Sequence, residues 1–396
     1  MNSTPLGNRK HIIIYGKTNS GKSSLINKIV GQDISIVSEK EGTTTDPVSK
    51  AMELIPVGPV VFYDTAGLYD KTDLGKKRME KTKDLLKRTD VGIYVSDINH
   101  VNDNEIKEGI LLFQQYNIPY ILVFNKCDDA PKDILSEIEA KYSNVIITSA
   151  KNNIGIEALR KSLIEIIQKE QEELPLVGDI LPYGSKVILV VPVDSEAPKG
   201  RLILPQVQCI RDCLDHGIKS YVVRDTELAT ALDDIKDVDL VITDSQAFKK
   251  VAEIVPKNIK ITGFSMLFAK QKGDINEFIN GTNYIKQLKP KDKVLVLESC
   301  THNVSHEDIG RVKIPRMLNN VVGGELNYTY MVGHDFPDDL ESYKFVIHCG
   351  GCMINRKTIV NRIKICKDKK IPIVNYGVIL SYLTNTLDRS KEIFFI

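Results

Sequence analysis

The sequence has little of what would mark a membrane protein, a secreted protein or a nucleic-acid-binding protein. Its 396 residues carry 53 basic and 52 acidic side chains, a formal charge of +1, so it offers no excess of positive charge for contacts with phosphate backbones. No apolar run approaches the roughly 18 residues of a membrane span, and no secretion signal precedes the first apolar segment. We therefore expect a cytoplasmic protein with no nucleic-acid and no membrane partner.

Cysteine is scarce and unevenly placed. The chain has seven cysteines, an odd number, and in a reducing compartment such spacing favours metal ligands or buried thiols over disulfides. The chain is also too long for one hydrophobic core, so we expect two or three domains.

Short apolar runs alternate with helical patterns up to about residue 173, which is typical of a largely parallel sheet with helices on both faces. The expected strands are His11–Tyr15, Val60–Tyr63, Val91–Val95, Tyr120–Phe124 and Val145–Ile147, and the series closes with a helix over Ile156–Glu172. Turn residues between Leu174 and Gly184 end the helical pattern, so we place a boundary there.

Two further α/β series follow this boundary. The first comprises strands Val187–Val193, Ser220–Val223 and Asp239–Ile242 with helices Gln206–Asp215 and Thr226–Asp234, and the second includes strands Lys293–Leu297, Lys344–Ile347 and Ile371–Val374. We therefore predict an α/β protein with domains 1–173, 174–268 and 269–396. The middle series shows no phosphate loop, metal spacing or acid/base pair, so we expect it to be structural and to form the contact of a homodimer.

A phosphate-binding loop follows the first expected strand. Residues 16–23 match the pattern G-x-x-x-x-G-K-S, whose glycines let backbone N–H groups turn inward around phosphates at the N-terminus of a helix. Lys22 would neutralise the β and γ phosphates, and Ser23 would bind magnesium. The nucleotide-binding residues predicted here are Gly16, Asn19, Ser20, Gly21, Lys22, Ser23 and Ser24.

Two later strand ends carry the other parts of a guanine-nucleotide site. Asp64 begins the segment Asp-Thr-Ala-Gly. We expect its carboxylate to hold the magnesium shell through water and the Gly67 N–H to lie near the γ phosphate. The segment Asn125-Lys126-Cys127-Asp128 reads the base, because the Asp128 carboxylate can accept from the N1–H and the amine of guanine, which adenine cannot offer together. Ser149, Ala150 and Lys151 complete the base pocket, and the bound nucleotides are expected to be GTP and GDP with magnesium.

A threonine-rich segment over residues 42–46 supplies a switch loop, and Thr44 is the expected magnesium ligand. With Lys22, Asp64 and Gly67, Thr44 completes the predicted catalytic set. This set resembles the Era and TrmE group of GTPases, in which an Asn at the position of Asn19 helps to bind potassium. Leu68 stands where Ras-like enzymes carry a water-orienting Gln, so the resemblance implies slow intrinsic hydrolysis that potassium stimulates.

A cluster of cysteine and histidine residues follows two strands of the third series. Cys300 and His302 come after one strand, and His348, Cys349 and Cys352 come after another. Two cysteines on one turn can hold an iron-sulfur cluster, and zinc would accept the same thiols with His302 or His348 as the fourth ligand. The residues alone predict a metal site and leave the metal open.

The combination of this GTPase domain with a C-x-H and H-C-x-x-C signature resembles the HydF family, the scaffold GTPases of FeFe-hydrogenase maturation. The resemblance extends over the whole chain. It implies a 4Fe-4S cluster held by Cys300, Cys349 and Cys352, with a labile fourth position. His302 and His348 are candidates for that position, and His306 or Glu307 would also be within reach of a short loop. It also implies that the protein receives a transient diiron subcluster, with radical-SAM maturases acting upstream, and delivers it to apo-FeFe-hydrogenase.

Two other functions compete with this interpretation. One is a GTPase of ribosome or tRNA processing with a C-terminal zinc module, which the neutral charge and the three thiols disfavour. The other is a redox sensor whose cluster controls GTP hydrolysis. Iron content separates the first from a maturation scaffold, and oxygen-dependent GTPase rates without hydrogenase activation would favour the second.

Overall fold

The structure is a computed structural model that describes residues 6–31, 37–40, 48–65, 82–170, 174–192, 202–299, 308–337 and 339–395. The chain divides into two compact units, Met1–Glu172 and Glu173–Ile396. Each is described separately below. Within the described residues, no helix combines the length and the hydropathy needed to cross a bilayer.

The first unit contains a mixed seven-stranded sheet with the order β2-β3-β4-β1-β5-β6-β7. Strands β4, β1, β5, β6 and β7 run parallel to one another, whereas β3 pairs antiparallel with both β2 and β4. The strands are β1 Lys10–Tyr15, β2 Val37–Lys40, β3 Val48–Leu54, β4 Gly58–Asp64, β5 Val91–Asp97, β6 Tyr120–Asn125 and β7 Val145–Ile147. The named helices are α1 Lys22–Val30, α3 Asp103–Gln115, α4 Lys132–Lys141 and α5 Ile156–Glu170.

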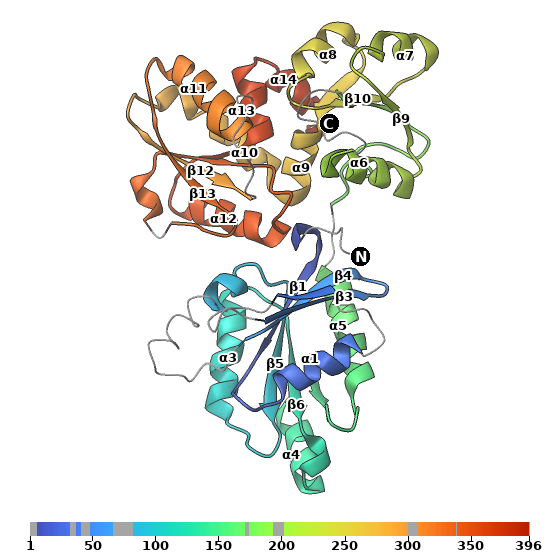
Figure 1. Cartoon of the computed structure of the whole chain (residues 1–396), viewed down its shortest axis with the longest axis vertical. Coiled ribbons are helices and arrows are strands. Elements are labelled where there is room, and N and C mark those ends of the chain that lie inside the picture. The colour runs from blue at the N-terminus through green and yellow to red at the C-terminus, as the bar shows by residue number, and fades with distance from the viewer. Residues whose placement is uncertain are drawn as a thin grey trace. The chain divides into compact units, whose positions relative to one another are not determined.

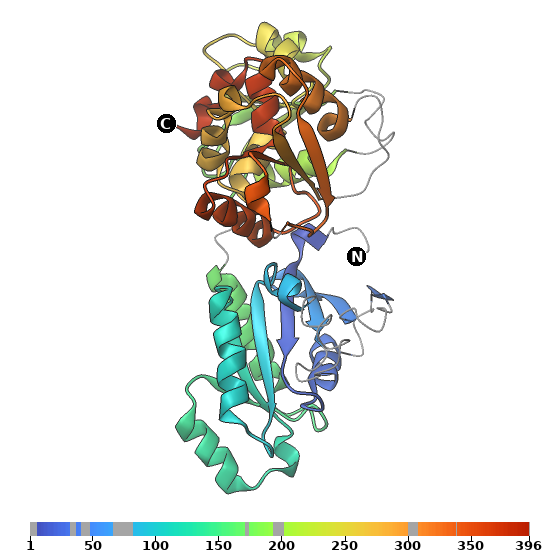
Figure 2. The same cartoon turned by 90° about the vertical axis from the view of Figure 1, so that its left-hand side faces the viewer.

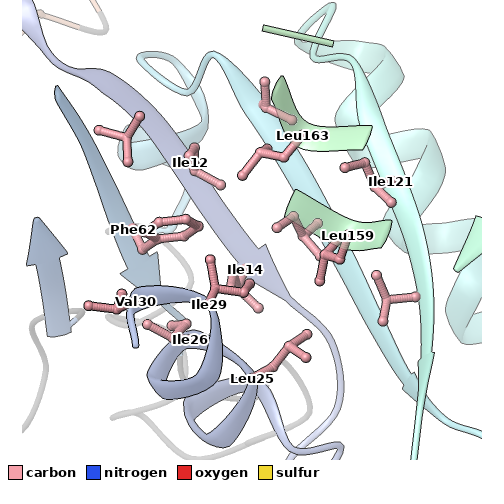
Figure 3. Close-up of a cluster of buried hydrophobic side chains, with 14 of the residues drawn as sticks. Ile12, Ile14, Leu25, Ile26, Ile29, Val30, Phe62, Ile121, Leu159 and Leu163 are labelled. Atoms are coloured by element: carbon pink, nitrogen blue, oxygen red, sulfur yellow. The ribbon is translucent and has the colours of Figure 1, made fainter. Parts of the chain in front are cut away.

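Apolar residues cover both faces of this sheet, as its near-continuous hydrophobic strands require. Helices α1 and α5 cover one face and α3 covers the other (Figure 1). Figure 3 shows the first face, where Ile14 of β1 lies beside Ile29 of α1. Phe62 of β4 and Leu159 of α5 belong to the same cluster. This packing fixes the edge at which β1, β4 and β6 end, and the polar loops follow from that edge.

The second unit begins with a four-stranded parallel sheet of order β11-β10-β8-β9. Helices α6 and α9 pack on one face and α7 and α8 on the other. The strands are β8 Lys186–Val190, β9 Lys219–Val223, β10 Leu240–Thr243 and β11 Lys260–Gly263. The helices are α6 Leu204–Asp215, α7 Leu228–Asp234, α8 Phe248–Ile254 and α9 Phe264–Lys272.

A second parallel sheet in this unit has the order β13-β12-β14-β15. Helices α11 and α13 cover one face, and α10 and α12 cover the other. The strands are β12 Lys293–Glu298, β13 Asn327–Val332, β14 Phe345–His348 and β15 Ile373–Asn375. The helices are α10 Ile275–Thr282, α11 Ile314–Val322, α12 Arg356–Asp368, α13 Tyr376–Leu383 and α14 Leu387–Lys391, and a π-helical turn over Ile309–Lys313 precedes α11.

The two sheets of the second unit repeat one topology. In each, the first strand is central, the second strand lies on one side of it, and the third and fourth strands lie on the other. The register agrees as well: Val190 pairs with Thr243 in the first sheet as Leu297 pairs with His348 in the second. The strand order therefore reverses between β8 and β10 and again between β12 and β14, which is where doubly wound sheets open a crevice at their carboxyl edge.

The end of the chain returns to the first of these two sheets. Thr262 Oγ1 of β11 donates to Ser390 O at 2.9 Å, and Arg389 donates to Ala252 O at 2.6 Å and to Val255 O at 2.8 Å. Both views place the red C-terminal helix α14 beside the yellow elements of the first sheet (Figures 1 and 2). These bonds tie the two sheets into one unit.

The predicted fold class is confirmed, because all three parts are α/β and the first contains a mostly parallel sheet. One strand prediction was too long: Val187–Val193 was expected, and β8 ends at Val190. Val191 still donates to Val223 O at 2.9 Å, but Pro192 has no N–H to continue the ladder. The boundaries at 173 and 268 stay predictions, and the predicted Thr44, Gly67, Cys300 and His302 lie outside the described residues.

Candidate nucleotide and metal-cluster sites

The phosphate loop between β1 and α1 depends on positive φ angles and on close backbone approach. The φ angles are 144° at Gly16, 66° at Asn19 and 92° at Gly21. A Cβ on Gly16 would lie 2.1 Å from Val95 O, so only glycine fits there. Asn19 is exposed, as are Ser23 and Ser24 in the first turn of α1. The loop therefore presents backbone and polar side chains at the N-terminus of α1.

Lys22 is buried and its ammonium is directed into the loop. Its Nζ donates to Gly16 O at 3.1 Å and to Lys17 O at 2.8 Å. Burial lowers the pKa of Lys22, and the negative charge of Asp64 opposes that shift. The loop thus holds a desolvated cation at the place where a phosphate-binding loop needs one.

Two of the predicted magnesium-side residues lie together. Asp64 is the last residue of β4, and its carboxylate accepts a hydrogen bond from the hydroxyl of Ser23. Thr65 follows, and its Oγ1 donates to Ile14 O at 2.7 Å, which fixes the end of β4 against β1. The hydroxyl and the carboxylate are the hard oxygen donors that magnesium prefers.

Asn125, at the end of β6, connects three loops through one buried amide. Its Nδ2 donates to Ser20 O at 3.0 Å, and its Oδ1 accepts from Ala150 N at 3.1 Å and from Thr148 Oγ1 at 3.2 Å. The phosphate loop approaches so closely that a Cβ on Gly21 would lie 2.2 Å from Asn125 Nδ2. The Asn side chain therefore sets the spacing between the phosphate loop and the base-reading loops.

Ion pairs and hydrogen bonds fix the base-reading segment that follows β6. Lys126 has a φ of 69°, and its Nζ lies 2.7 Å from Asp97 Oδ2 at the end of β5. Ser149 Oγ donates to Asp128 Oδ1 at 2.5 Å, and Lys151 Nζ lies 3.7 Å from Asp128 Oδ2. The Ser149 hydrogen bond is the main cause of a lowered pKa at Asp128, so the carboxylate is ionised and can accept from a base.

The structure brings two further residues into this group that no sequence motif pointed to. Asp97 and Thr148 belong to no nucleotide motif, although Asp97 ends an apolar strand adjacent to the base-reading one. A polar residue at a neighbouring strand end was the available signal for Asp97. Thr148 carried no comparable signal.

A second group of polar side chains lies in the second unit, where β12 and β14 end side by side. Cys349 follows β14, and its Sγ accepts from Ser299 N at 3.1 Å and from Gly351 N at 3.4 Å. A hydrogen bond of 3.2 Å also joins this sulfur to Ser299 Oγ. Ser299 directly precedes the predicted ligand Cys300, so the described residues bring the two strand ends of the signature together. Backbone N–H groups aimed at a cysteine sulfur are the surroundings that a thiolate ligand requires.

His348 is fully buried and both of its ring nitrogens are engaged. Nδ1 donates to Cys349 O at 2.6 Å, and Nε2 accepts from an Arg362 N–H at 3.0 Å. Burial and the adjacent Arg362 lower the pKa of His348 to about 3, so the ring is neutral. Arg362 also donates to Gly333 O at 2.9 Å. Ligation by His348 Nε2 would require its contact with Arg362 to break.

The turn between Cys349 and Cys352 is shaped by glycine and by a buried lysine. Gly351 has a φ of 70°, and a Cβ there would lie 2.5 Å from Ile359 Cδ1. Lys272, at the end of α9, donates to Gly351 O at 3.0 Å and to Ile354 O at 3.2 Å. Burial lowers the pKa of Lys272 to about 8, and the negative charges of Cys352 and Cys349 oppose the shift. No sequence motif pointed to Lys272, Arg362 or Ser299.

The described residues contain no group of three or more potential metal ligands. Cys300 and His302 lie outside the described residues. The donor set that is described nevertheless fits an iron-sulfur cluster. It offers two partly buried cysteines on one turn, N–H groups directed at one sulfur, and a nearby cation.

The phosphate loop, the Ser23–Asp64 pair and the base-reading strand end, all at one edge of a mixed sheet, define a P-loop GTPase. Residues 11–126 match the family described as "50S ribosome-binding GTPase". Residues 176–273 match "Hydrogen maturase F dimerization domain", and residues 276–393 match "Hydrogen maturase F tetramerization domain". The chain therefore belongs to the hydrogen maturase F (HydF) family. The two domain descriptions imply a homo-oligomer.

Two curated relatives match part of the chain. The tRNA modification GTPase MnmE of Cytophaga hutchinsonii is 33% identical over 214 residues, covering 52% of this chain and 45% of that protein. GTPase Der of Kosmotoga olearia is 35% identical over 178 residues, covering 41% of this chain and 40% of that protein. The chain thus spans less than half the length of these curated relatives, which place its first part in the MnmE- and Der-related GTPases.

Solved structures show only a distant likeness. Era of Aquifex aeolicus bound to GDP and aluminium fluoride has a TM-score of 0.34 at 19% identity, covering 62% of this chain and 97% of that one. The G domain of the T. maritima iron transporter FeoB has a TM-score of 0.31 at 21% identity, covering 40% of this chain and 99% of that one.

Proposed function

We propose that this protein is a GTP-hydrolysing scaffold that binds a 4Fe-4S cluster and carries a diiron precursor to apo-FeFe-hydrogenase. The observation that supports this most is the pairing of Ser299 with Cys349. It joins the two halves of the C-x-H and H-C-x-x-C signature at one sheet edge, in a chain that belongs to the HydF family. The diiron subcluster is cargo in this scheme, and radical-SAM maturases supply it.

Hydrolysis of GTP follows from the roles of the first site. Lys22 and the loop N–H groups would bind the β and γ phosphates, and Ser23, Asp64 and Thr44 would hold magnesium. The role assigned to Gly67 is to donate its N–H to the γ phosphate, and that of Asp128 is to select guanine. Asn19 would help to hold a potassium ion, whose positive charge would act beside the phosphates where other GTPases use an arginine, and we therefore expect potassium to stimulate hydrolysis.

The cluster site is formed by Cys300, Cys349 and Cys352. Three thiolates leave one iron with an exchangeable position, and the bound cluster would supply that iron as a docking point for the diiron cargo. His302 is a better candidate for the fourth ligand than His348, because both ring nitrogens of His348 are already engaged. Ser299 and Gly351 donate hydrogen bonds to the Cys349 sulfur, and burial together with Arg362 lowers the pKa of His348, so its ring is neutral.

The separate placement of the two sites suggests what GTP does. No described residue of the nucleotide site belongs to the cluster signature, so GTP regulates the exchange of partners rather than the inorganic chemistry. A homo-oligomer is expected to present the cluster domains to the upstream maturases and to the hydrogenase.

Iron content tests the cluster proposal. The chain is purified without oxygen, reconstituted with iron and sulfide, and measured for iron, absorbance and EPR beside Cys349→Ala and, as a control thiol outside the site, Cys127→Ala. We expect about four irons per chain and a reducible cluster in the wild type and the control, and their loss in Cys349→Ala. Zinc without iron would refute the scaffold and favour a GTPase with a zinc module.

Phosphate release in potassium and in sodium at equal ionic strength tests the cation proposal. We expect faster hydrolysis in potassium for the wild type and equal rates in the two salts for Asn19→Ala. Equal rates in the wild type would remove the role assigned to Asn19.

A further inference from the structure

A buried lysine lies behind the cysteine turn. Lys272 is 6% exposed and ends α9, immediately before Gly273. Its ammonium donates to Gly351 O at 3.0 Å and to Ile354 O at 3.2 Å. Within the described part of the chain, no carboxylate forms an ion pair with Lys272. A buried ammonium without a negatively charged partner costs free energy. An anionic group near Lys272 would therefore stabilise it.

The neighbouring anionic groups are the thiolates of the signature. The charges that act on Lys272 are those of Cys352 and Cys349. The two carbonyls that Lys272 holds lie on either side of Cys352 in the sequence. A cluster held by cysteine thiolates carries negative charge, so a metal-loaded site supplies the missing counter-charge.

Gly351 connects the lysine to the cysteine sulfur through its two backbone groups. Its N–H points to Cys349 Sγ at 3.4 Å, while its carbonyl accepts from Lys272 at 3.0 Å. The positive φ at Gly351 allows this arrangement. Lys272 thus fixes two carbonyls of the turn whose Gly351 N–H bonds the Cys349 sulfur.

We propose that Lys272 is a positioning residue of the cluster site, which fixes the Cys349–Cys352 turn for ligation and raises the reduction potential of the bound cluster by its positive charge. This inference rests on the proposed cluster. A fixed cation favours the reduced, more negative state, and the charges and hydrogen bonds around a cluster are established determinants of its potential.

Two substitutions separate the two roles. Lys272→Gln keeps a donor for the carbonyls and removes the charge, whereas Lys272→Met removes both. Lys270→Met is the matched control on the same helix, because Lys270 bonds instead to Asp179 and Pro175 O. Lys272→Arg keeps the charge and the donors.

The measurement is an equilibrium redox titration of the anaerobically reconstituted full chain, followed by EPR, with iron content recorded for each variant. We expect Lys272→Gln to keep its iron and to favour the reduced state about tenfold less, a shift of about 59 mV to more negative potential for one electron. Lys272→Met should also lose iron, and Lys270→Met and Lys272→Arg should match the wild type.

The outcomes distinguish this inference from the function on which it rests. A wild type without iron would refute the proposed function itself. Iron in the wild type with an unchanged potential in Lys272→Gln would refute the electrostatic role of Lys272, and full iron content in Lys272→Met would refute its positioning role. A potential for Lys272→Arg as low as that of Lys272→Gln would also overturn the assignment.

Discussion

The buried amide of Asn125 offers the sharpest test of how the nucleotide site is assembled. In Asn125→Ala, three hydrogen bonds are lost, and Ser20 O and Ala150 N are left without the partners that they have in the structure. Each net hydrogen bond contributes about 0.5 to 1.5 kcal/mol, so the free energy of unfolding of the nucleotide-free unit should fall by about 2 to 4 kcal/mol.

For a domain of this size, such a loss lowers the melting temperature by about 4 to 16 °C, which thermal unfolding of the nucleotide-free protein measures. The affinity for a fluorescent GDP analogue should fall as well, because the phosphate loop and the base-reading loops lose their common support. Asn99→Ala is the matched control, since Asn99 lies at the same sheet edge and makes weaker contacts of 3.4 Å to Asp97 and to Lys126 O. A melting temperature for Asn125→Ala within 2 °C of this control would refute the reasoning.

Three further predictions follow from single residues. Lys22→Met should lower kcat/KM for GTP about 100- to 1000-fold in a phosphate-release assay, with the exposed Lys28→Met of the same helix unchanged. Burial lowers the pKa of His11 below 6.5, so the unfolded state binds more protons below that pH. Stability of the first unit is therefore present above about pH 6.5 and is lost as the pH falls below it, and His11→Asn should flatten the dependence of melting temperature on pH between 7.5 and 5.5. Gly351→Ala should reduce iron incorporation, because the positive φ and the close Ile359 oppose a Cβ. In the same iron assay Gly350→Ala should behave as the wild type, since nothing lies within 4 Å of a Cβ there.

The sequence predicted the elements whose signal is local. Continuous apolar runs identified β1, β4, β5 and β6, because strands buried on both faces show such runs, and the phosphate-loop pattern marked the start of α1. The strand β3 was missed: its residues Val48–Leu54 mix apolar and charged side chains at the antiparallel side of the sheet, where one-sided burial gives a weaker signal.

The parts of the sites that could not be predicted depend on contacts between residues far apart in the chain. Lys272 reaches Gly351 across 79 positions, and Asn125 reaches Ser20 across 105. A motif reports the spacing of ligands along one loop, whereas the groups that orient those ligands come from whichever helix or strand end the fold places beside them. Arg362 illustrates this: it lies on a helix 14 positions after His348, and only the packing of α12 on the sheet brings the two together.

The repeated strand order of the second unit has an evolutionary consequence. Two copies of one topology give a single chain two equivalent carboxyl edges, and the residue after the third strand is Asp244 in one copy and Cys349 in the other. The backbone N–H of Cys349 donates to Leu297 O at 2.8 Å, a bond that any residue except proline would keep, so the side chain at that place can change. The second sheet can therefore carry metal ligands at this edge while the first sheet carries other side chains there, such as those of a contact surface between subunits.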